Sequence, residues 1–587
     1  MVLEQLGLIG NCQFAALVAA SGEVAWCCLP RFDSEPVFGS LLDPGGGGLL
    51  AGPADGSVGV QRYLDNTNVL ETVFTAPGGR FRVVDFAPRF EQYGRIFRPA
   101  MIVRLLEPLE GSPRLSVRCE PVLGWSKERP PMTQGSHHLQ FGGYAAPLRL
   151  TTDIPLSYLD GRPFSLTERK RLVLTLGEPV EESLAPLCDR LLAGTVDHWR
   201  RWVKHCDIPP DYQQSVIRSA LALKLHCFED TGAIVASVTT SVPEAPGSGR
   251  TWDYRYCWLR DSYYVIDAFR LLGQFDERDA FVNYILNVAG GHTDLALAPL
   301  YSVTGAPAPL ERVLPNWAGF NGDGPVRVGN DAVGQVQHDI FGEIVLALAP
   351  IFHDDRFSAE RTPAALDLIW RLAERASGLA GTPDKGIWEY RRDPEPQTFS
   401  ALMCWAASDR AAVIAERFAP DRARTLRRAA DRIRQEIGEQ AWSDQRQAFC
   451  GTYRGHTLDA SLLQMVPLRL FPRDDPKLLA TVDAIRNGLS HNGWLMRYRD
   501  DDGLGTPAAA FVLCTFWLIE ALALVGRHAD ARDLMNAAGK LSSPLGLIAE
   551  DYDTVLHQMS GNFPQAYSHV GEIRAAFAAS PRWLDVL

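Results

Sequence analysis

Three separated segments of the chain place carboxylates beside tryptophan and tyrosine, a combination suited to sugar chemistry. They are RTWDYRYCWLRD (250–261), GIWEYR (386–391) and GLIAEDYD (546–553). Flat aromatic faces offer apolar platforms to the C–H faces of a sugar ring, and Arg and Asp offer fixed donors and acceptors to its hydroxyls. Two carboxyl groups, one protonated and one ionised, can cleave a glycosidic bond.

Structural roles compete with this interpretation at each residue. The chain has 70 Asp and Glu residues, and most such groups are solvated on a protein surface. Trp252 and Trp258 are of types that often pack in a core, and the pair Arg260 and Asp261 could simply stabilise a helix N-terminus. There is no phosphate-binding loop, HExxH, GxSxG or EF-hand motif. The residue types alone leave a carbohydrate site and a structural role open.

The elements that would position these residues change character near residue 186. Before it, short apolar or alternating runs such as Phe81–Phe86 and Met101–Leu106 are separated by Gly, Pro, Asp and Asn. This spacing predicts an antiparallel β-sandwich in residues 1–185. An amphipathic run follows, which predicts a linker helix over residues 186–208.

After residue 209 the pattern is helical. About twelve segments have helical length, and the one at 507–526 is apolar nearly all round, as a helix buried on most sides would be. About twelve helices, several of them buried on most sides, predict two concentric layers, that is, an α/α barrel in residues 209–587. Loops 231–260, 291–336 and 542–561 are long, which in a compact domain is typical of functional segments.

Composition narrows the class of ligand and the compartment. The 587 residues are 46% hydrophobic, and the formal charge of −12 comes without a basic run. We therefore expect neither nucleic acid nor a membrane as partner, but a neutral small molecule. No apolar run reaches the roughly 18 residues of a membrane span. Eleven cysteines without a CxxC pair indicate a reduced, cytoplasmic location, and nothing predicts a metal site or an oligomeric state.

The stretch RTWDYRYCWLRDS resembles the signature of glycoside hydrolase family 15, the glucoamylase and bacterial-trehalase-like family. Further matches follow in the same order over nearly the whole chain, among them PVRVGNDAVGQVQHDIFGE, DKGIWEYR and GLIAEDYD followed by GNFPQAYSHV. The resemblance implies a β-sandwich of the super-sandwich type followed by an (α/α)6 barrel. It also implies exo-acting, inverting hydrolysis of α-glucosides without a cofactor.

The resemblance assigns roles to particular residues. Glu389, directly after a Trp, matches the family's general acid, and Glu550 matches its general base. Arg260 and Asp261 match the motif that binds the glucose at the non-reducing end. We expect Glu389 to be kept protonated by burial beside its neighbouring Trp. Residues expected to line the pocket or contact sugar are Tyr254, Trp258, Trp388, Arg391 and Trp317.

Two departures from the family pattern leave the preferred leaving group open. Ala401 stands where many bacterial members carry Lys, and residues 507–510 replace a Glu-Gly pair; both could lie near the mouth of the pocket. Three functions remain: release of β-glucose from short α-glucans, hydrolysis of α,α-trehalose, or sugar binding without catalysis. The presence of both Glu389 and Glu550 counts against the last. A small closed acceptor site would favour trehalose, and an open groove would favour glucans.

Overall fold

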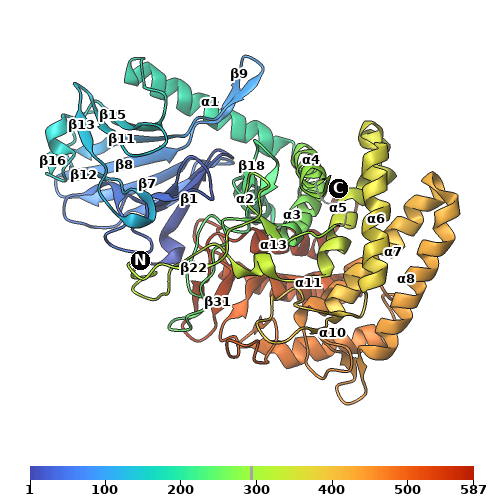
Figure 1. Cartoon of the computed structure of the whole chain (residues 1–587). Coiled ribbons are helices and arrows are strands. Elements are labelled where there is room, and N and C mark those ends of the chain that lie inside the picture. Colours follow the sequence, from blue (N-terminus) through green and yellow to red (C-terminus); the bar gives the residue numbers. More distant parts are fainter. Residues whose placement is uncertain (291–294) are drawn as a thin grey trace.

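The computed structural model describes residues 1–290 and 295–587. It combines a strand-rich N-terminal part with a larger helical part (Figure 1). The predicted loop 291–336 begins at residues 291–294, which lie outside the described residues.

The N-terminal part consists mainly of two large antiparallel sheets, beside a hairpin of β9 (Phe90–Gln92) and β10 (Arg95–Phe97). In spatial order, the larger sheet contains β13 (Met132–Gln134), β14 (His138–Phe141), β15 (Leu148–Thr152), β17 (Lys170–Leu176), β11 (Met101–Gly111), β8 (Gly79–Phe86), β7 (Leu70–Ala76) and β6 (Val60–Tyr63). The smaller contains β1 (Leu6–Gly10), β2 (Ala15–Ala19), β3 (Glu23–Cys28), β5 (Gly48–Pro53), β12 (Arg114–Glu120) and β16 (Phe164–Ser165), with β4 (Pro36–Phe38) beside β3. The predicted β-sandwich is confirmed.

Alternate side chains of strand β11 point to opposite faces of the larger sheet and so pack into different clusters. Ile102 and Leu106 belong to the main core, whereas Val103 and Leu105 face the opposite way, into a separate cluster. Between the core residues, the fully buried Arg104 pairs with Asp85 of β8 and donates to backbone carbonyls near β3 and in β5. The hydrogen bonds from Arg104 to these carbonyls therefore join the two sheets.

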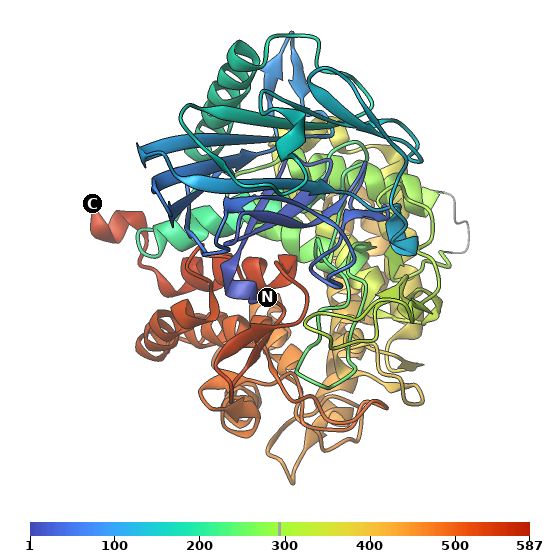
Figure 2. The ribbon, with the colours of Figure 1, turned by 90° about the vertical axis from the view of Figure 1, so that its left-hand side faces the viewer.

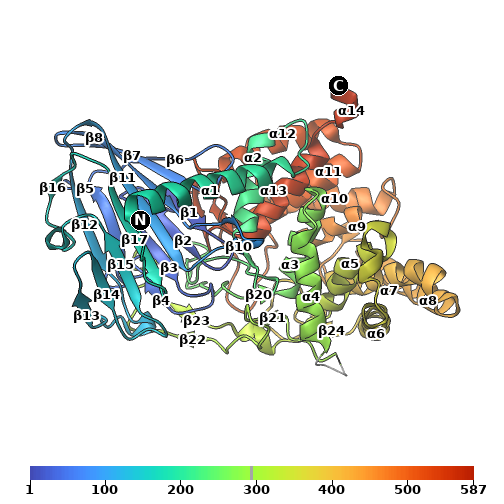
Figure 3. The same cartoon turned by 90° about the horizontal axis from the view of Figure 1, so that it is seen from above.

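Helix α1 (Leu184–Lys204) covers the outer face of the larger sheet. Its residues Leu187, Cys188 and Leu191 fill the cluster that contains Val103 and Leu105 of β11. Figure 3 shows α1 running along the sheet towards the helical part. The helix begins two residues before the predicted linker and ends four residues before its predicted end.

Twelve segments of the described helical part form two concentric layers. The inner ring consists of α3 (Leu259–Leu271), α5 (Asp339–His353), α7 (Thr398–Phe418), the pair η6 (Ala460–Gln464) and α9 (Met465–Leu468), α11 (Val512–Leu524) and α13 (Ala566–Ala579). The outer layer consists of α4 (Asp276–Gly290), α6 (Pro363–Leu379), α8 (Pro420–Gln440), α10 (Pro476–Leu489), α12 (His528–Ala538) and α2 (Gln213–Lys224). Successive inner segments contact one another, α13 closes the ring on α3, and each inner segment packs mainly against one outer helix. The predicted (α/α)6 barrel is confirmed; the short α14 (Trp583–Val586) follows it.

The two layers follow from different apolar patterns. Outer helix α8 buries only Leu426, Ala430, Ile433 and Ile437, a single stripe at helical spacing. Inner helix α11 buries every residue from 512 to 523, as expected for a helix packed on all sides.

The three segments that combine carboxylates with Trp and Tyr, called the sugar-type segments below, each precede an inner helix. Residues 250–261 lead into α3, 386–391 precede α7, and 546–553 precede α13. Because successive inner helices are neighbours and each pairs with an outer helix that returns the chain, these segments meet at one end of the barrel. That end is where the candidate site lies.

The sandwich packs against the loops at this end, as the view in Figure 2 shows from the side of the sheets. Trp26 of β3 donates to the backbone carbonyl of Val238, and Arg255 donates to that of Ser34. Trp317 belongs to this contact: its indole N–H donates to the carbonyl of Trp125, whose ring centroid lies 5.2 Å away. The sandwich thereby braces the loops that carry the site.

All eleven cysteines are unpaired and ten are buried, which confirms their predicted role as small core residues. Within residues 1–290 and 295–587, no helix combines the length and apolar character needed to cross a membrane.

Candidate active site

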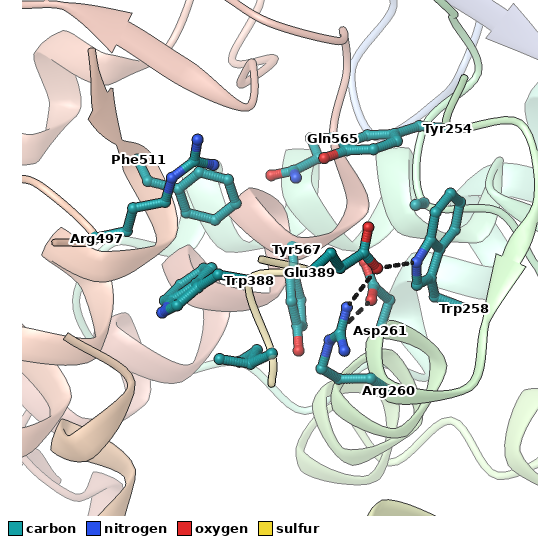
Figure 4. A pocket seen from close by; sticks show the side chains of 12 residues that line it. Tyr254, Trp258, Arg260, Asp261, Trp388, Glu389, Arg497, Phe511, Gln565 and Tyr567 are labelled. Carbon is teal, nitrogen blue, oxygen red and sulfur yellow. Dashed lines mark hydrogen bonds and ion pairs between the residues drawn. The ribbon is translucent and has the colours of Figure 1, made fainter. Parts of the chain in front are cut away.

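Two adjoining chambers lie at this end of the barrel. The first, of about 460 Å³, is drawn in Figure 4 and is lined by Ala236, Tyr254, Trp258, Arg260, Asp261, Ile387, Trp388, Glu389, Arg497, Phe511, Gln565 and Tyr567. The second, of about 380 Å³, is lined by Glu244, Arg250, Trp252, Tyr254, Trp388, Glu389, Arg391, Arg497, Asp502 and Leu504. Glu389 belongs to both linings and therefore stands where the chambers meet.

A tight turn aims Glu389 at this border. Its φ of 60° lies in the left-handed region, which side-chain-bearing residues seldom adopt outside functional sites. The turn closes through a hydrogen bond from the Glu389 N–H to the carbonyl of Gly386. Gly386 has a φ of 65°, and a Cβ there would meet the Gln397 side chain at 2.9 Å. The turn therefore requires glycine.

The carboxylate of Glu389 is anchored through one oxygen. Its Oε1 accepts hydrogen bonds from Trp258 Nε1 at 2.7 Å and from Arg260 Nη2 at 3.2 Å (Figure 4). The neighbouring Trp388 lines both chambers with Glu389, and its indole N–H is held by Asp459 at 2.9 Å. Trp258 and Arg260 hold the carboxylate of Glu389, and its protonation by burial beside Trp388 stays a prediction.

Arg260 is the centre of a buried polar cluster on the first turn of α3. Its Nη1 donates to Gln337 at 2.8 Å and to Asp339 at 3.1 Å, so the side chain is fixed before any ligand arrives. Asp261 lines the same chamber and is 8% exposed. Burial raises the pKa of Asp261 to about 7, although Arg260 opposes the rise.

Glu550 lines neither chamber; it lies behind Tyr254, whose side chain lines both. The Glu550 side chain is fully buried; its Oε2 accepts from the backbone N–H of Asn562 at 3.0 Å, and its Oε1 has no hydrogen-bond partner among the described residues. A Cβ on Gly561 would meet this side chain at 2.7 Å, so only glycine leaves room for it. Burial, followed by the negative charge of Glu244, raises the pKa of Glu550 to about 8.

The second chamber is built from paired charges. Glu244 accepts from Arg250 at 2.8 Å, Arg497 at 2.7 Å and the Trp252 indole at 2.8 Å. Burial alone would raise the pKa of Glu244, but the two arginines outweigh it and keep the pKa below its ordinary value. Asp502 accepts two hydrogen bonds from Arg250. The chamber thus offers many fixed donors and acceptors with little net charge.

The structure gathers most of the predicted site residues. Arg391 lines the second chamber, where its guanidinium lies 5.1 Å from the Trp252 ring centre and 3.6 Å from Glu311, not against a proposed catalytic carboxylate. Trp317 lines neither chamber, and the expectation that it contacts sugar is corrected by its place between sandwich and barrel. Ala401 and residues 507–510 also lie outside both linings.

Several lining residues escaped the sequence interpretation. Arg497 and Asp502 lie in a loop that was not singled out, although its run of charged residues, RYRDDD, was a visible signal. Gln565 directly precedes α13 and Tyr567 lies in its first turn, whereas Phe511 ends the short strand β30 (Ala510–Phe511) directly before α11. Within the described part of the chain, no group of three or more His, Cys, Asp and Glu side chains is arranged to hold a metal ion.

Comparisons with known proteins agree with this architecture. Residues 210–577 match the model of glycosyl hydrolases family 15, and residues 1–153 match the model described as trehalase-like, N-terminal. A trehalase of Mycolicibacterium smegmatis is 33% identical over 98% of this chain and 90% of its own length. A trehalase of Thermoplasma volcanium is 32% identical over 98% and 93%.

A solved structure shows the same fold. A bacterial glucoamylase complexed with acarbose superposes with a TM-score of 0.68, covering 98% of this chain and 94% of its own, at 15% identity. The family match spans the barrel with all three sugar-type segments, and the relatives span both parts of the chain. The chain belongs to glycosyl hydrolases family 15 and is a glycoside hydrolase.

Proposed function

We propose that the protein hydrolyses α,α-trehalose to two molecules of glucose. The observation that carries this proposal is the position of Glu389 between two small polar chambers. Both chambers are small and meet at Glu389, which suits one hexose on either side of the scissile bond. The relatives named trehalases support the same substrate.

The first chamber would hold the glucose whose C1 is attacked. Arg260 and Asp261 would bind its hydroxyls, and Trp258 and Tyr567 would flank its ring. The second chamber would hold the leaving glucose among Glu244, Arg497 and their partners. A small chamber of fixed charged groups favours a disaccharide over a long glucan, for which an open groove is expected.

Glu389 would act as the general acid. Because Oε1 is held by Trp258 and Arg260, the other oxygen is the one that would give its proton to the glycosidic oxygen. The leaving glucose would depart as its neutral alcohol. Positive charge developing at C1 would be stabilised by the carboxylates and aromatic faces of the first chamber.

Glu550 would act as the general base. Its unpartnered Oε1 is the atom that would accept a proton from a water attacking C1 on the face opposite the leaving group. The attacked glucose would then be released as the β anomer, while the leaving glucose keeps its α configuration. Two carboxyl groups suffice for these proton transfers, so the scheme uses neither a metal nor a cofactor.

Domain roles and location are part of the same proposal. Residues 209–587 would form the catalytic domain, residues 1–185 the supporting sandwich, and residues 186–208 the link between them. A cytoplasmic location is supported by the eleven unpaired thiols.

Measuring kcat/KM on trehalose, maltose and isomaltose tests the substrate. We expect trehalose to exceed both others by about 100-fold, since the second chamber can be complementary to only one orientation of the leaving hexose. Equal or faster cleavage of maltose and longer maltodextrins would favour the short-glucan hydrolase instead. Tight sugar binding without turnover of any α-glucoside would favour the sugar-binding protein.

A further inference from the structure

We propose that residues 501–505 form a wall that restricts the leaving group to a single hexose, with Leu504 as the residue that blocks a second one. This inference rests on the proposed function, because it assigns the second chamber to the leaving sugar. The segment begins with the last two residues of the charged run RYRDDD (497–502) and lies between α10 and α11.

Leu504 stands at the mouth of the second chamber. Most residues of the lining are buried or only partly accessible, but Leu504 is 47% exposed while also facing the chamber. Trp252 and Arg391, on other segments, are among the half-buried residues of the lining. A leaving group longer than one hexose would have to pass between these three side chains.

The wall is fixed rather than loose. The Asp502 carboxylate binds Arg250 twice and also accepts from the Tyr498 hydroxyl and from the Leu504 N–H. Asp501 accepts from the N–H groups of Gly503 and Gly505, at 2.7 and 3.0 Å. These bonds hold Leu504 in place from both sides.

The wall is also fastened to the segment that carries the proposed acid. The Arg391 N–H donates to the Asp502 carbonyl at 2.9 Å, two residues beyond Glu389. Gly503 has a φ of 96°, and a Cβ there would meet the backbone of residues 391–392 at 3.0 to 3.1 Å. The wall therefore cannot swing away from Glu389 without breaking these contacts.

The chemistry of the mouth disfavours a second sugar. Arg250, Arg497 and Arg391 each lie near a carboxylate, so the balanced chamber suits a neutral hexose. Leu504 carries no group that can bond a hydroxyl. A second ring would desolvate its hydroxyls against this side chain without replacing their hydrogen bonds, which is costly.

The test compares two leaving groups of different length. One substrate is trehalose, and the other is the trisaccharide in which one glucose of trehalose carries a further α-1,4-linked glucose, so that cleavage at the trehalose bond releases maltose. We expect the wild type to form maltose from the trisaccharide about 100-fold more slowly, as kcat/KM, than it cleaves trehalose. Chromatography distinguishes maltose plus glucose from trehalose plus glucose, the products of cutting the other bond.

Leu504→Gly should raise the ratio of kcat/KM for maltose release to kcat/KM on trehalose about tenfold. Leu504→Met, which keeps an apolar side chain of similar volume, should leave this ratio near that of the wild type. Equal cleavage of the two substrates by the wild type, or an unchanged ratio in Leu504→Gly, would overturn the proposal.

Failure of the proposed function gives a different result. An enzyme that leaves trehalose intact but cleaves maltose refutes trehalose as substrate, and the ratio of maltotriose to maltose then tests the wall in the same variants. Calorimetric affinities of the paired sugars for Glu389→Gln, with and without Leu504→Gly, provide the same contrast without turnover. Equal affinity for short and long sugars in Glu389→Gln would count against the wall.

Discussion

Replacing Glu244 by glutamine tests the electrostatic coupling between the second chamber and the proposed base. Glu244 is buried, and its low pKa means that it is ionised throughout the usual assay range. Its charge is the largest cause, after burial, of the raised pKa of Glu550. Glutamine keeps the shape but removes the charge, and it leaves Arg497 less neutralised; both effects favour ionised Glu550.

The size of the expected fall in the pKa of Glu550 follows from the loss of one like charge. Loss of a like charge at close range lowers a pKa by about 1 unit or more. With a pKa of about 8, roughly 1% of Glu550 is ionised at pH 6, and a fall of about one unit raises this fraction to roughly 10%. A general base must be ionised, so activity is lost as pH falls through its pKa. The acidic limb of kcat/KM should therefore move about one unit to lower pH.

The assay is the pH dependence of kcat/KM on trehalose, from pH 5 to 10, for the wild type and Glu244→Gln. The position of the limb is the readout, since the lost hydrogen bonds of Glu244 also lower the plateau. Glu311→Gln is the matched control, because Glu311 pairs with Arg327 and Arg391 and is absent from the causes that shift Glu550. A limb that stays in place or moves to higher pH in Glu244→Gln would refute the reasoning.

Further substitutions probe the proposed acid, the proposed base, the contacts of Arg260 and the sandwich. Glu389→Gln should lower kcat on trehalose by about 10²–10⁴-fold yet retain activity on α-glucosyl fluoride, whose leaving group needs no proton, whereas Glu550→Gln should lose both activities; parallel losses in the two variants would contradict the assignment. Arg260→Lys should lower kcat/KM about 100-fold in steady-state assays, because an ammonium group cannot replace the planar guanidinium that reaches Gln337, Asp339 and Glu389. Near-normal activity would show that these contacts are not needed for catalysis. Arg104→Ala should destabilise the protein by about 3–5 kcal/mol in urea unfolding, because it leaves Asp85 charged and buried, and a loss below about 1 kcal/mol would show that the pair is dispensable.

The sequence predicted those features that are local in the chain. The period of two in strands such as β11 and the contrast between α8 and α11 encode the sandwich and the two-layered barrel. The sugar-type segments supplied Glu389, Arg260 and Asp261, which do line one chamber. Their common position follows from barrel closure, because each segment enters an inner helix.

The remaining features depend on contacts between distant segments. Glu244 and Arg497 are 253 residues apart, and no local pattern marks their pairing. Trp317 looked like a sugar platform by residue type, but its partner Trp125 comes from the sandwich. The Glu389 carboxylate is likewise held by Trp258 and Arg260, which are 131 and 129 residues away in the chain. Such contacts form only when distant segments of the chain come together in the folded protein.

The most direct test of the central claim is proton NMR of the anomeric signals during the first moments of trehalose hydrolysis, before the sugars mutarotate. An inverting attack with Glu389 as acid and Glu550 as base predicts one β-glucose for each α-glucose at the earliest times. Release of α-glucose alone would show retention and contradict the assignment of Glu550 as the base.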